Sequence, residues 1–232
     1  MKPLVSCIVP VFNGERYLAE ALDSILAQTW RPLEVIVVDD DSTDGSAAVV
    51  AKYDAQVSYV YQANAGPAAA RNRGLDAAAG AFIAFLDADD LWREDKLDRQ
   101  MARFEARPGL DLCIAHLENF WTPDMKRERG WQSDIGLAKT QPGVSQAMIA
   151  RRALFDRIGP FDTTLKYRDT MEWLSRAVDA GALMETLPDV LVFRRIHRNN
   201  ISWHRGDDDR EELLRSVKTI LDRRRRTSEA DG

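Results

Sequence analysis

The chain has 232 residues, of which 45% are hydrophobic and 30% are charged, and its formal net charge at pH 7 is −5. This composition is typical of a soluble globular protein, and the mild acidity argues against a nucleic-acid-binding protein, which usually carries a basic face. The longest apolar run, residues 77–86, is much shorter than the roughly 20 residues that a membrane-spanning helix needs, so the sequence predicts no such helix.

In chain order, the first half alternates between short apolar runs and helical patterns. The predicted strands are residues 4–12, 33–38, 57–61 and 81–86. The predicted helices are residues 17–26, a short helix ending near residue 53, and residues 67–79. Asn13 is expected to cap the first helix and Gly80 the last. Strands that are apolar on both faces, alternating with helices over short links, predict an α/β fold with a doubly wound, mostly parallel sheet.

After Asp90 the pattern changes. The predicted elements are a helix at 91–107, a strand at 110–120, a strand passing into a short helix at 146–155, a helix at 169–180, a strand at 190–196 and a helix at 207–226. Residues 121–143 lack periodicity, which predicts a loop, and residues 227–232 are expected to be a frayed tail. The last helix begins with acidic residues and ends with arginines, an order that suits the helix dipole.

Polar residues follow the predicted strands at the point where each strand ends. In open α/β sheets, ligands bind beyond the carboxyl ends of the strands. The polar clusters are residues 10–13, 39–41, 64–66 and 87–90. Each alone could simply satisfy its own loop, since Asp, Asn and Ser bond nearby backbone groups. Several clusters at one edge of a sheet indicate a ligand site instead.

The residue types in these clusters suit a diphosphate. Neither a Gly-x-Gly-x-x-Gly motif nor a P-loop motif is present, which argues against a dinucleotide-binding or P-loop protein. Asp87 and Asp89 are two residues apart, so their side chains are expected on one side. Their carboxylates suit Mg²⁺ or Mn²⁺, which could bridge a diphosphate. The guanidinium of Arg71 could donate two hydrogen bonds to phosphate oxygens, or Arg71 could be an ordinary surface arginine.

Four of these segments together resemble the inverting family-2 glycosyltransferases, which have the GT-A fold. The segments are residues 5–14 (VSCIVPVFNG), 34–45 (EVIVVDDDSTDG), 64–72 (NAGPAAARN) and 85–90 (FLDADD). They occur in the family's order and at suitable spacing. Residues 158–162 (IGPFD) and 194–202 (RRIHRNNIS) also resemble the family, whereas residues 110–145 match poorly.

The resemblance implies that a sugar is transferred with inversion from a nucleotide diphosphate donor, preferably a UDP-sugar, to an acceptor hydroxyl. The acceptor would be a glycan, a lipid-linked molecule or a small molecule. The implied nucleotide-binding residues are Pro10, Val11, Phe12, Asn13, Asp39, Asp41, Asn64, Gly66, Arg71, Asp87 and Ala88. Among them, Asp39 would contact the base, Asp87 the ribose and Arg71 the diphosphate.

The resemblance also implies a divalent metal cofactor, Mn²⁺ or Mg²⁺. Its ligands would be Asp89 and His197, although a lone histidine is more often structural. The expected organisation is one GT-A domain over residues 1–226. Residues 1–95 would bind the nucleotide-sugar. Residues 96–206 would bind the acceptor and contain the catalytic residues, and the last helix would span residues 207–226.

The sequence departs from the family at the expected catalytic base. Many members carry Glu-Asp at the start of a helix, whereas this chain has Asp169-Thr170. Threonine is not a useful base, so Asp169 or Glu172 is expected to take the proton. The alternative is that Asp169 and Glu172, three residues apart, form a helix-capping box.

Two other functions remain open from the sequence. A noncatalytic GT-A domain could bind a nucleotide-sugar or a partner enzyme. The best support for this function is Thr170, which stands where the family usually has the catalytic aspartate. A nucleotidyltransferase is disfavoured, because the glycine-rich phosphate loop expected after its first strand is absent.

Two isolated cysteines and the absence of a secretory signal predict a cytoplasmic location. Enzymes of this kind often act in polysaccharide and cell-envelope biosynthesis. The four arginines at 223–226 could contact anionic lipid at the inner face of the membrane, or could simply suit the helix dipole.

Overall fold

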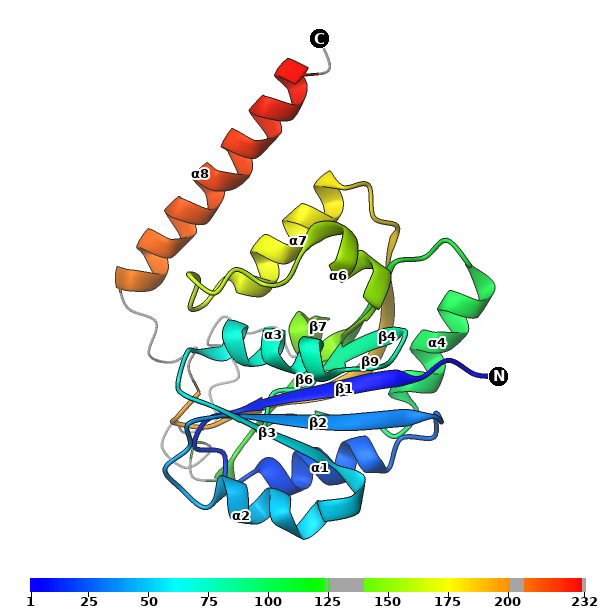
Figure 1. Ribbon diagram of the computed structural model, residues 1–232, viewed down its shortest axis with the longest axis vertical. Helices are drawn as coiled ribbons and strands as arrows, with labels where there is room; N and C mark the ends of the chain where they lie inside the picture. Colours follow the sequence, from blue (N-terminus) through cyan, green and yellow to red (C-terminus); the bar gives the residue numbers. More distant parts are fainter. Residues whose placement is uncertain (124, 126–139, 201–206, 231–232) are drawn as a thin grey trace.

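The computed structural model describes residues 1–123, 125, 140–200 and 207–230. Within these residues the chain forms a mixed, nine-stranded sheet with helices on both faces (Figure 1). Helices α1 and α2 lie on one face, and α3, α6 and α7 lie on the other. The predicted α/β fold is therefore confirmed.

The predicted strands of the first half are confirmed, and they form the parallel part of the sheet in the order β3-β2-β1-β4. Their bounds are β1 Val5–Val11, β2 Leu33–Asp40, β3 Ser58–Gln62 and β4 Phe82–Phe85. The helices between them are α1 Leu18–Leu26, α2 Ser46–Val50, the 3-10 helix η1 Ala51–Gln56 and α3 Pro67–Ala77.

In the second half, β8 pairs antiparallel with β4, β6 pairs antiparallel with β8, and β9 pairs parallel with β6. The strands are β5 Leu91–Trp92, β6 Leu112–Trp121, β7 Thr140–Pro142, β8 Met148–Arg151 and β9 Met184–Ile196. The helices are α4 Lys96–Ala106, the 3-10 helix η2 Ser145–Ala147, α6 Arg152–Ile158, α7 Asp169–Asp179 and α8 Asp207–Ala230.

Several predicted boundaries need correction. The strand expected at 190–196 already begins at Met184, as β9. The helix expected at 91–107 begins only at Lys96, because residues 91–92 pair with β9 as β5. The loop expected at 121–143 contains β7, while residues 124 and 126–139 of that prediction lie outside the described residues. Helix α8 continues to Ala230, through most of the expected tail.

Both predicted caps are wrong. Asn13 lies outside α1, and its Oδ1 instead accepts the N–H of Thr43 at 2.8 Å. Helix α3 ends at Ala77, and the N–H of Gly80 donates to Oγ of Ser6 at 2.8 Å. Both residues tie one loop to another segment rather than closing a helix.

Two apolar layers hold the sheet between its helices. One packs α1 and α4 against the first face, and the other packs α3, α6 and α7 against the second. Helix α3 lies so close to β1 that a Cβ on Gly74 would be 2.3 Å from Cγ2 of Ile8. Cys7 and Cys113 are both buried free thiols.

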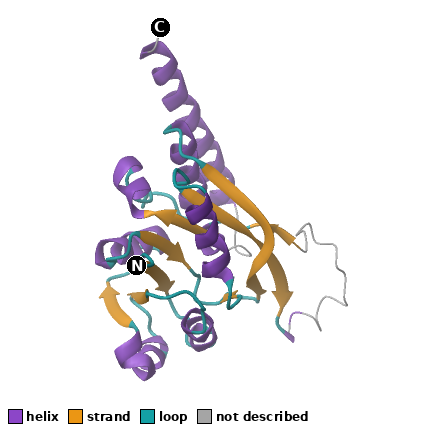
Figure 2. Ribbon diagram, turned by 90° about the vertical axis from the view of Figure 1, so that its right-hand side faces the viewer, coloured by secondary structure: helices purple, strands orange, loops and turns teal. Residues whose placement is uncertain are grey.

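Helix α8 extends away from the sheet and its main helical neighbour is α7 (Figures 1 and 2). Its exposed apolar side chains are Leu213, Leu214, Val217 and Leu221. Among the described residues, no helix combines the length and the apolar character that crossing a membrane requires.

Candidate functional site

The predicted polar clusters meet at one edge of the sheet. Strands β1, β2 and β4 run parallel, with Val11 opposite Asp39 and Ile8 opposite Phe85. The residues that follow these strands therefore emerge on the same side of the molecule. The turn at residues 64–66 joins them, because it is hydrogen-bonded to the end of β2.

The end of β1 offers an exposed aromatic ring. Phe12 is 55% exposed and Pro10 is half-buried, so both are accessible to a ligand. The Val11 side chain lies in the core, which leaves only its backbone for the nucleotide contact expected from the sequence. Asn13 is exposed, but its Oδ1 is engaged by Thr43.

Two tyrosines of β3 bind the carboxylates at the end of β2. The Tyr59 hydroxyl donates to Oδ2 of Asp39 at 2.7 Å, and the Tyr61 hydroxyl donates to Oδ1 of Asp41 at 2.5 Å. The Ser42 N–H donates to Oδ1 of Asp39 at 2.8 Å. Burial, with the adjacent Asp39 carboxylate, raises the pKa of Tyr59 to about 12, so its hydroxyl stays a donor. The Asp39 carboxylate is thus fixed in orientation.

Asp40 fixes the turn before α3. Its Oδ1 accepts the N–H of Ala65 and its Oδ2 that of Gly66, both at 2.9 Å. Asn64 Nδ2 donates to the backbone oxygen of Asp40 at 2.9 Å. Gly66 has a φ of 89°, which glycine adopts without strain. Asn64 and Gly66 therefore shape the turn from which α3 begins.

Arg71 joins two carboxylates from distant parts of the chain. Its Nη1 lies 2.6 Å from Oδ2 of Asp169, and its Nη2 lies 3.1 Å from Oδ1 of Asp87. Arg71 is buried, so it is not an ordinary surface arginine. Burial alone would lower the pKa of Arg71, but the charges of Asp169 and Asp87 outweigh this and raise it. The guanidinium therefore stays charged between them.

Asp89 and His197, the expected metal ligands, are in direct contact. Nε2 of His197 lies 2.8 Å from Oδ2 of Asp89, and Asn200 Nδ2 donates to the same oxygen at 2.9 Å. The Asn199 N–H donates to Nδ1 of His197 at 3.3 Å. Nδ1 therefore accepts a hydrogen bond, and Nε2 is the ring nitrogen that faces Asp89 and would face a shared cation.

The chemistry of this pair fits a divalent cation that is shared with a bound phosphate. Mg²⁺ and Mn²⁺ favour carboxylate oxygens, and Mg²⁺ is often bound by one or two carboxylates together with substrate phosphates. The Asp89 side chain is 27% exposed and that of His197 is 11% exposed. Within the described parts of the chain, no group of three or more His, Cys, Asp or Glu residues could hold a metal.

Arg195 and Asp90 hold the turn that carries Asp89. Arg195 Nε donates to the backbone oxygen of Asp89, and the Arg195 N–H donates to Oδ1 of Asp90, both at 2.9 Å. The guanidinium lies over the rings of Tyr17 and Phe120. Burial raises the pKa of Asp90 well above its usual value, and the neighbouring aspartates add to this effect.

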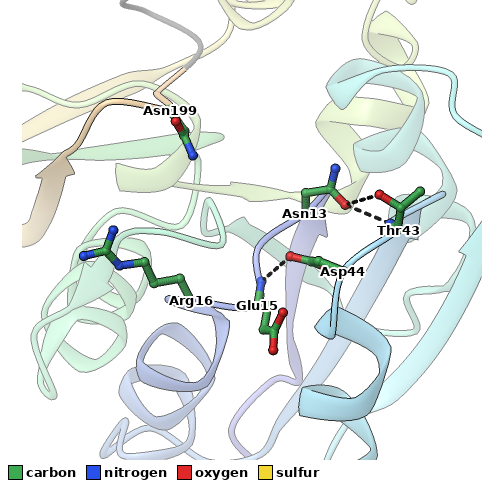
Figure 3. A pocket seen from close by; sticks show the side chains of 6 residues that line it. All are labelled: Asn13, Glu15, Arg16, Thr43, Asp44 and Asn199. Carbon is green, nitrogen blue, oxygen red and sulfur yellow. Dashed lines mark hydrogen bonds between the residues drawn. The ribbon is translucent and has the colours of Figure 1, made fainter.

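An open hollow of about 630 Å³ is bordered by Asn199, whose backbone N–H donates to His197 (Figure 3). Its lining residues are Asn13, Glu15, Arg16, Thr43, Asp44 and Asn199. The Glu15 N–H donates to Oδ2 of Asp44 at 3.0 Å, which ties the two loops on one side together. Arg16 and Asn199 lie across from them, so an exposed cation borders the hollow.

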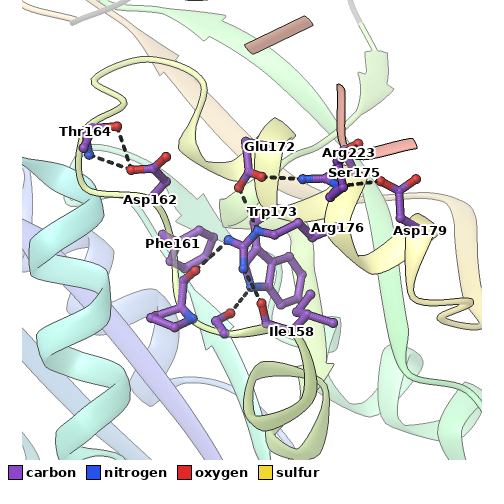
Figure 4. A network of polar contacts seen from close by, with 12 residues as sticks. Ile158, Phe161, Asp162, Thr164, Glu172, Trp173, Ser175, Arg176, Asp179 and Arg223 are labelled. Atoms are coloured by element: carbon purple, nitrogen blue, oxygen red, sulfur yellow. Dashed lines mark hydrogen bonds and ion pairs between the residues drawn. The ribbon is translucent and has the colours of Figure 1, made fainter. Parts of the chain in front are cut away.

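Glu172, the second candidate base, lies in a different network between α7 and α8 (Figure 4). Its Oε2 accepts from Arg176 Nε at 2.8 Å, and its Oε1 accepts from Arg223 Nη1 at 3.0 Å. Both oxygens of Glu172 are thus bound to cations, whereas Asp169 has one described cation contact, from Arg71 to its Oδ2. The capping-box alternative is wrong, since the N-cap of α7 is Arg168 and no side chain caps it.

Sequence reasoning missed several residues that build the site. Asp40 and Asn200 were within reach, since each lies inside a motif that the sequence singled out. Tyr59 could have been found from its two-residue spacing to Tyr61 on a predicted strand. Arg195 lies in the same 194–202 motif as Asn200, but its contacts with Asp89 and Asp90 depend on tertiary packing that the motif does not show.

The sequence was compared with a family model and with the sequences of known proteins. The model of the family described as Glycosyl transferase family 2 matches residues 6–158. An uncharacterized glycosyltransferase of Rickettsia typhi is 32% identical over 208 residues, which are 84% of this chain and 64% of that protein. This chain thus spans less than two thirds of the length of that relative.

The chain also resembles solved structures. S. aureus TarS 1–349 in complex with UDP superposes with a TM-score of 0.71 at 24% identity, over 95% of this chain and 64% of that one. The mannosyltransferase PcManGT from Pyrobaculum calidifontis, in complex with GDP-Man and Mn²⁺, gives a TM-score of 0.67 at 25% identity, over 88% of this chain and 60% of that one. These likenesses confirm the predicted fold.

Proposed function

The chain belongs to glycosyl transferase family 2, and we propose that it transfers a sugar from a nucleoside diphosphate donor to an acceptor hydroxyl with inversion. The proposal rests on one observation: Asp39, the Asp89–His197 pair and the Arg71–Asp169 ion pair converge at one edge of the sheet. These groups have the chemistry to bind a base, a diphosphate and an acceptor hydroxyl, respectively.

The donor is proposed to be a nucleoside diphosphate sugar, with a UDP-sugar as the first choice. Similar structures hold UDP, UDP-GlcNAc and GDP-Man, which supports this class of donor. In this chain the fixed carboxylate of Asp39 can accept an N–H of the base, and the exposed Phe12 ring offers an apolar face.

Asp89 and His197 would hold a divalent cation, and the Mn²⁺ in the PcManGT complex supports this assignment. When bound, the cation would stabilise the negative charge of the leaving diphosphate. The chain's own part is to orient the carboxylate: Asn200 donates to Oδ2 of Asp89, and Arg195 fixes its backbone.

Asp169 is the proposed general base, which takes the proton from the acceptor hydroxyl while the sugar is attacked from the face opposite the diphosphate. Arg71 orients this carboxylate through its Nη1. Asp169 can accept a proton only if the acceptor hydroxyl reaches an oxygen of its carboxylate. Thr170, at the position that the family usually gives to the base, has no such capacity.

We further propose that residues 1–226 form one catalytic domain, with the nucleotide-binding half in residues 1–95 and the acceptor-binding half in residues 96–206. The proposed acceptor is a glycan, a lipid-linked molecule or a small molecule of polysaccharide or envelope biosynthesis. The two free thiols suit a cytoplasmic site of action, which could include the inner face of the membrane.

A donor panel tests the proposal. The protein is incubated with UDP- and GDP-sugars, with and without Mn²⁺, and release of the nucleoside diphosphate is measured with candidate acceptors. The expected result is metal-stimulated turnover of one nucleotide class. Absence of turnover with every donor and acceptor, in protein that still binds nucleotide, would refute catalysis.

The second candidate is a noncatalytic nucleotide-sugar-binding domain. It is favoured by the tight ion pair of Asp169 with Arg71, since that carboxylate is 5% exposed and already engaged. Nucleotide binding by calorimetry together with absent turnover would support this candidate over the first.

A further inference from the structure

We propose that Glu212, on α8, is a positioning residue that holds the start of α7 and thereby keeps Asp169 in place. This inference rests on the proposed function in one respect: it takes Asp169 to be the general base. Glu212 touches neither Asp169 nor Arg71 in any described contact, so its effect passes through the backbone of the residues between them.

The Glu212 carboxylate accepts hydrogen bonds from three successive backbone amides. Oε2 accepts the N–H of Lys166 at 3.0 Å, and Oε1 accepts those of Tyr167 and Arg168, both at 2.8 Å. Glu212 is only 6% exposed. A buried carboxylate that accepts several backbone N–H groups makes strong, charge-assisted bonds.

These amides directly precede the candidate base. Arg168 is the N-cap residue of α7, and Asp169 is its first helical residue. No side-chain cap closes this helix end, and Glu212 adds a third carboxylate to those of Asp169 and Glu172 in the first turn. Replacing the carboxylate by an amide would remove the charge and one acceptor oxygen, so at least one of the three backbone amides would lose its acceptor.

The displacement would reach the site by a short route. Asp169 follows Arg168 by one peptide bond, and its Oδ2 lies 2.6 Å from Nη1 of Arg71. Arg71 in turn contacts Asp87, which precedes the expected metal ligand Asp89 by two residues. Since a misplacement of about 1 Å can slow a catalysed reaction on the order of 10²-fold, a loosened α7 start would reduce turnover.

The remaining anchor of α8 on α7 is separate. Arg223 donates to Asp179 at 2.7 Å, to Glu172 at 3.0 Å and to Ser175 at 3.0 Å (Figure 4). These contacts lie beyond the first residue of α7. The two anchors can therefore be removed one at a time.

Three variants test the proposal: Glu212→Gln, Asp222→Asn and Arg223→Gln. Asp222→Asn is the matched control, because it makes the same acid-to-amide change farther along α8. Hydrogen–deuterium exchange at residues 166–168 is expected to be at least about 10-fold faster in Glu212→Gln and unchanged in Asp222→Asn. Arg223→Gln is expected to affect exchange later in α7.

The activity readout is a split between kcat and donor binding. We expect Glu212→Gln to lower kcat about 10- to 100-fold, while the Kd for the nucleoside diphosphate stays within about twofold, because the base-binding strands are untouched. If Glu212→Gln does not fold, Glu212→Asp, which keeps the charge, is measured instead and should give faster exchange with a smaller loss of kcat.

Unchanged exchange at residues 166–168 in the folded variant overturns the proposal. Faster exchange with unchanged kcat, in an enzyme that Asp169→Asn inactivates, also overturns the positioning role. If the wild type turns over no donor, the proposed function fails, and the exchange result alone decides whether Glu212 holds the start of α7.

Discussion

Lys96 has no exposed surface, although lysine is almost never fully buried without a partner. Its Nζ lies 4.1 Å from the centroid of the Trp92 ring and has no hydrogen-bond partner among the described residues. Burial lowers the pKa of Lys96 to about 7, because the ammonium is disfavoured away from water. The folded chain therefore binds this proton more weakly than the unfolded chain.

The contribution of Lys96 to stability should consequently rise with pH between pH 7 and 9. In this window the unfolded lysine is protonated and the folded one is losing its proton, so the unfolding free energy should gain up to about 1.4 kcal/mol per pH unit. From about pH 8, Cys7 and Cys113 act in the opposite direction, because the unfolded thiols begin to lose their protons while burial raises the pKa of both folded thiols. Lys96→Met should remove the rise.

Urea unfolding at pH 7, 8 and 9 measures this effect. Lys52→Met, at an exposed lysine, serves as the control and should keep the wild-type slope. Equal slopes for Lys96→Met and the wild type would show that Lys96 is not buried in its neutral form.

Asp89 and Asp39 should respond differently to metal. Asp89→Asn is expected to abolish the increase in nucleoside diphosphate affinity that Mn²⁺ provides, because the variant loses the anionic ligand. Asp39→Ala should weaken binding with and without Mn²⁺, because a base contact does not depend on the ion. Calorimetric titration measures both, and a full Mn²⁺ effect in Asp89→Asn would contradict the assignment.

Asp169 and Glu172 should separate chemistry from stability. Asp169→Asn is expected to lower kcat about 10²–10⁴-fold with donor binding intact, as for a lost general base. Glu172→Gln weakens ion pairs to Arg176 and Arg223, so it should mainly lower the melting temperature. Near-normal kcat in Asp169→Asn would mean that another residue takes the proton.

At the scale of elements, the contact of α3 with β1 sets where Arg71 lies. Gly74→Ala would place a Cβ 2.3 Å from Cγ2 of Ile8, so the helix must shift. We expect a loss of about 1–3 kcal/mol in unfolding free energy, the usual cost of overpacking. Gly109→Ala, whose Cβ would meet only Leu183 at 3.4 Å, is the control for urea unfolding.

The parallel strands were predictable because each is buried on both faces and reads as a continuous apolar run, as in β1 and β2. Strand β5 was not predictable, because Leu91 and Trp92 also fit the helical pattern that continues into α4. Asn13 was misassigned because its partner, Thr43, belongs to another loop. Sequence signals report local order, whereas such bonds depend on tertiary contacts.

The same distinction applies to the candidate site. Asp89 and His197 were predicted by family resemblance and do lie in contact. The ion pair of Arg71 with Asp169 joins residues 98 positions apart, and no spacing in the sequence indicates it. Glu212 was likewise missed, because an acidic residue on a charged helix looks like an ordinary surface residue.

At the scale of the whole molecule, the proposed site draws on both halves of the chain. Strands β1, β2 and β4 supply the sheet edge, while α7 and the segment after β9 supply Asp169 and His197. Ligand binding across these elements should stabilise the fold as a unit, because a ligand that binds only the folded state shifts the unfolding equilibrium.

A thermal-shift series tests this expectation. UDP with Mn²⁺ should raise Tm more than UDP or Mn²⁺ alone, and a ligand at 100 times its Kd should add about 2.7 kcal/mol to the unfolding free energy. Asp89→Asn should lose the extra shift that Mn²⁺ adds to UDP. Equal shifts with and without Mn²⁺ in the wild type would contradict a shared metal–nucleotide site.

The buried thiols described above make the protein suitable for site-specific labelling. Burial raises the pKa of Cys7 to about 12 and that of Cys113 to about 11, and only the thiolate reacts readily with maleimides. Both natural cysteines should therefore stay unmodified in the folded protein at neutral pH. A cysteine introduced at Leu214, which is 65% exposed on α8, would carry a single fluorophore that reports the movement of that helix.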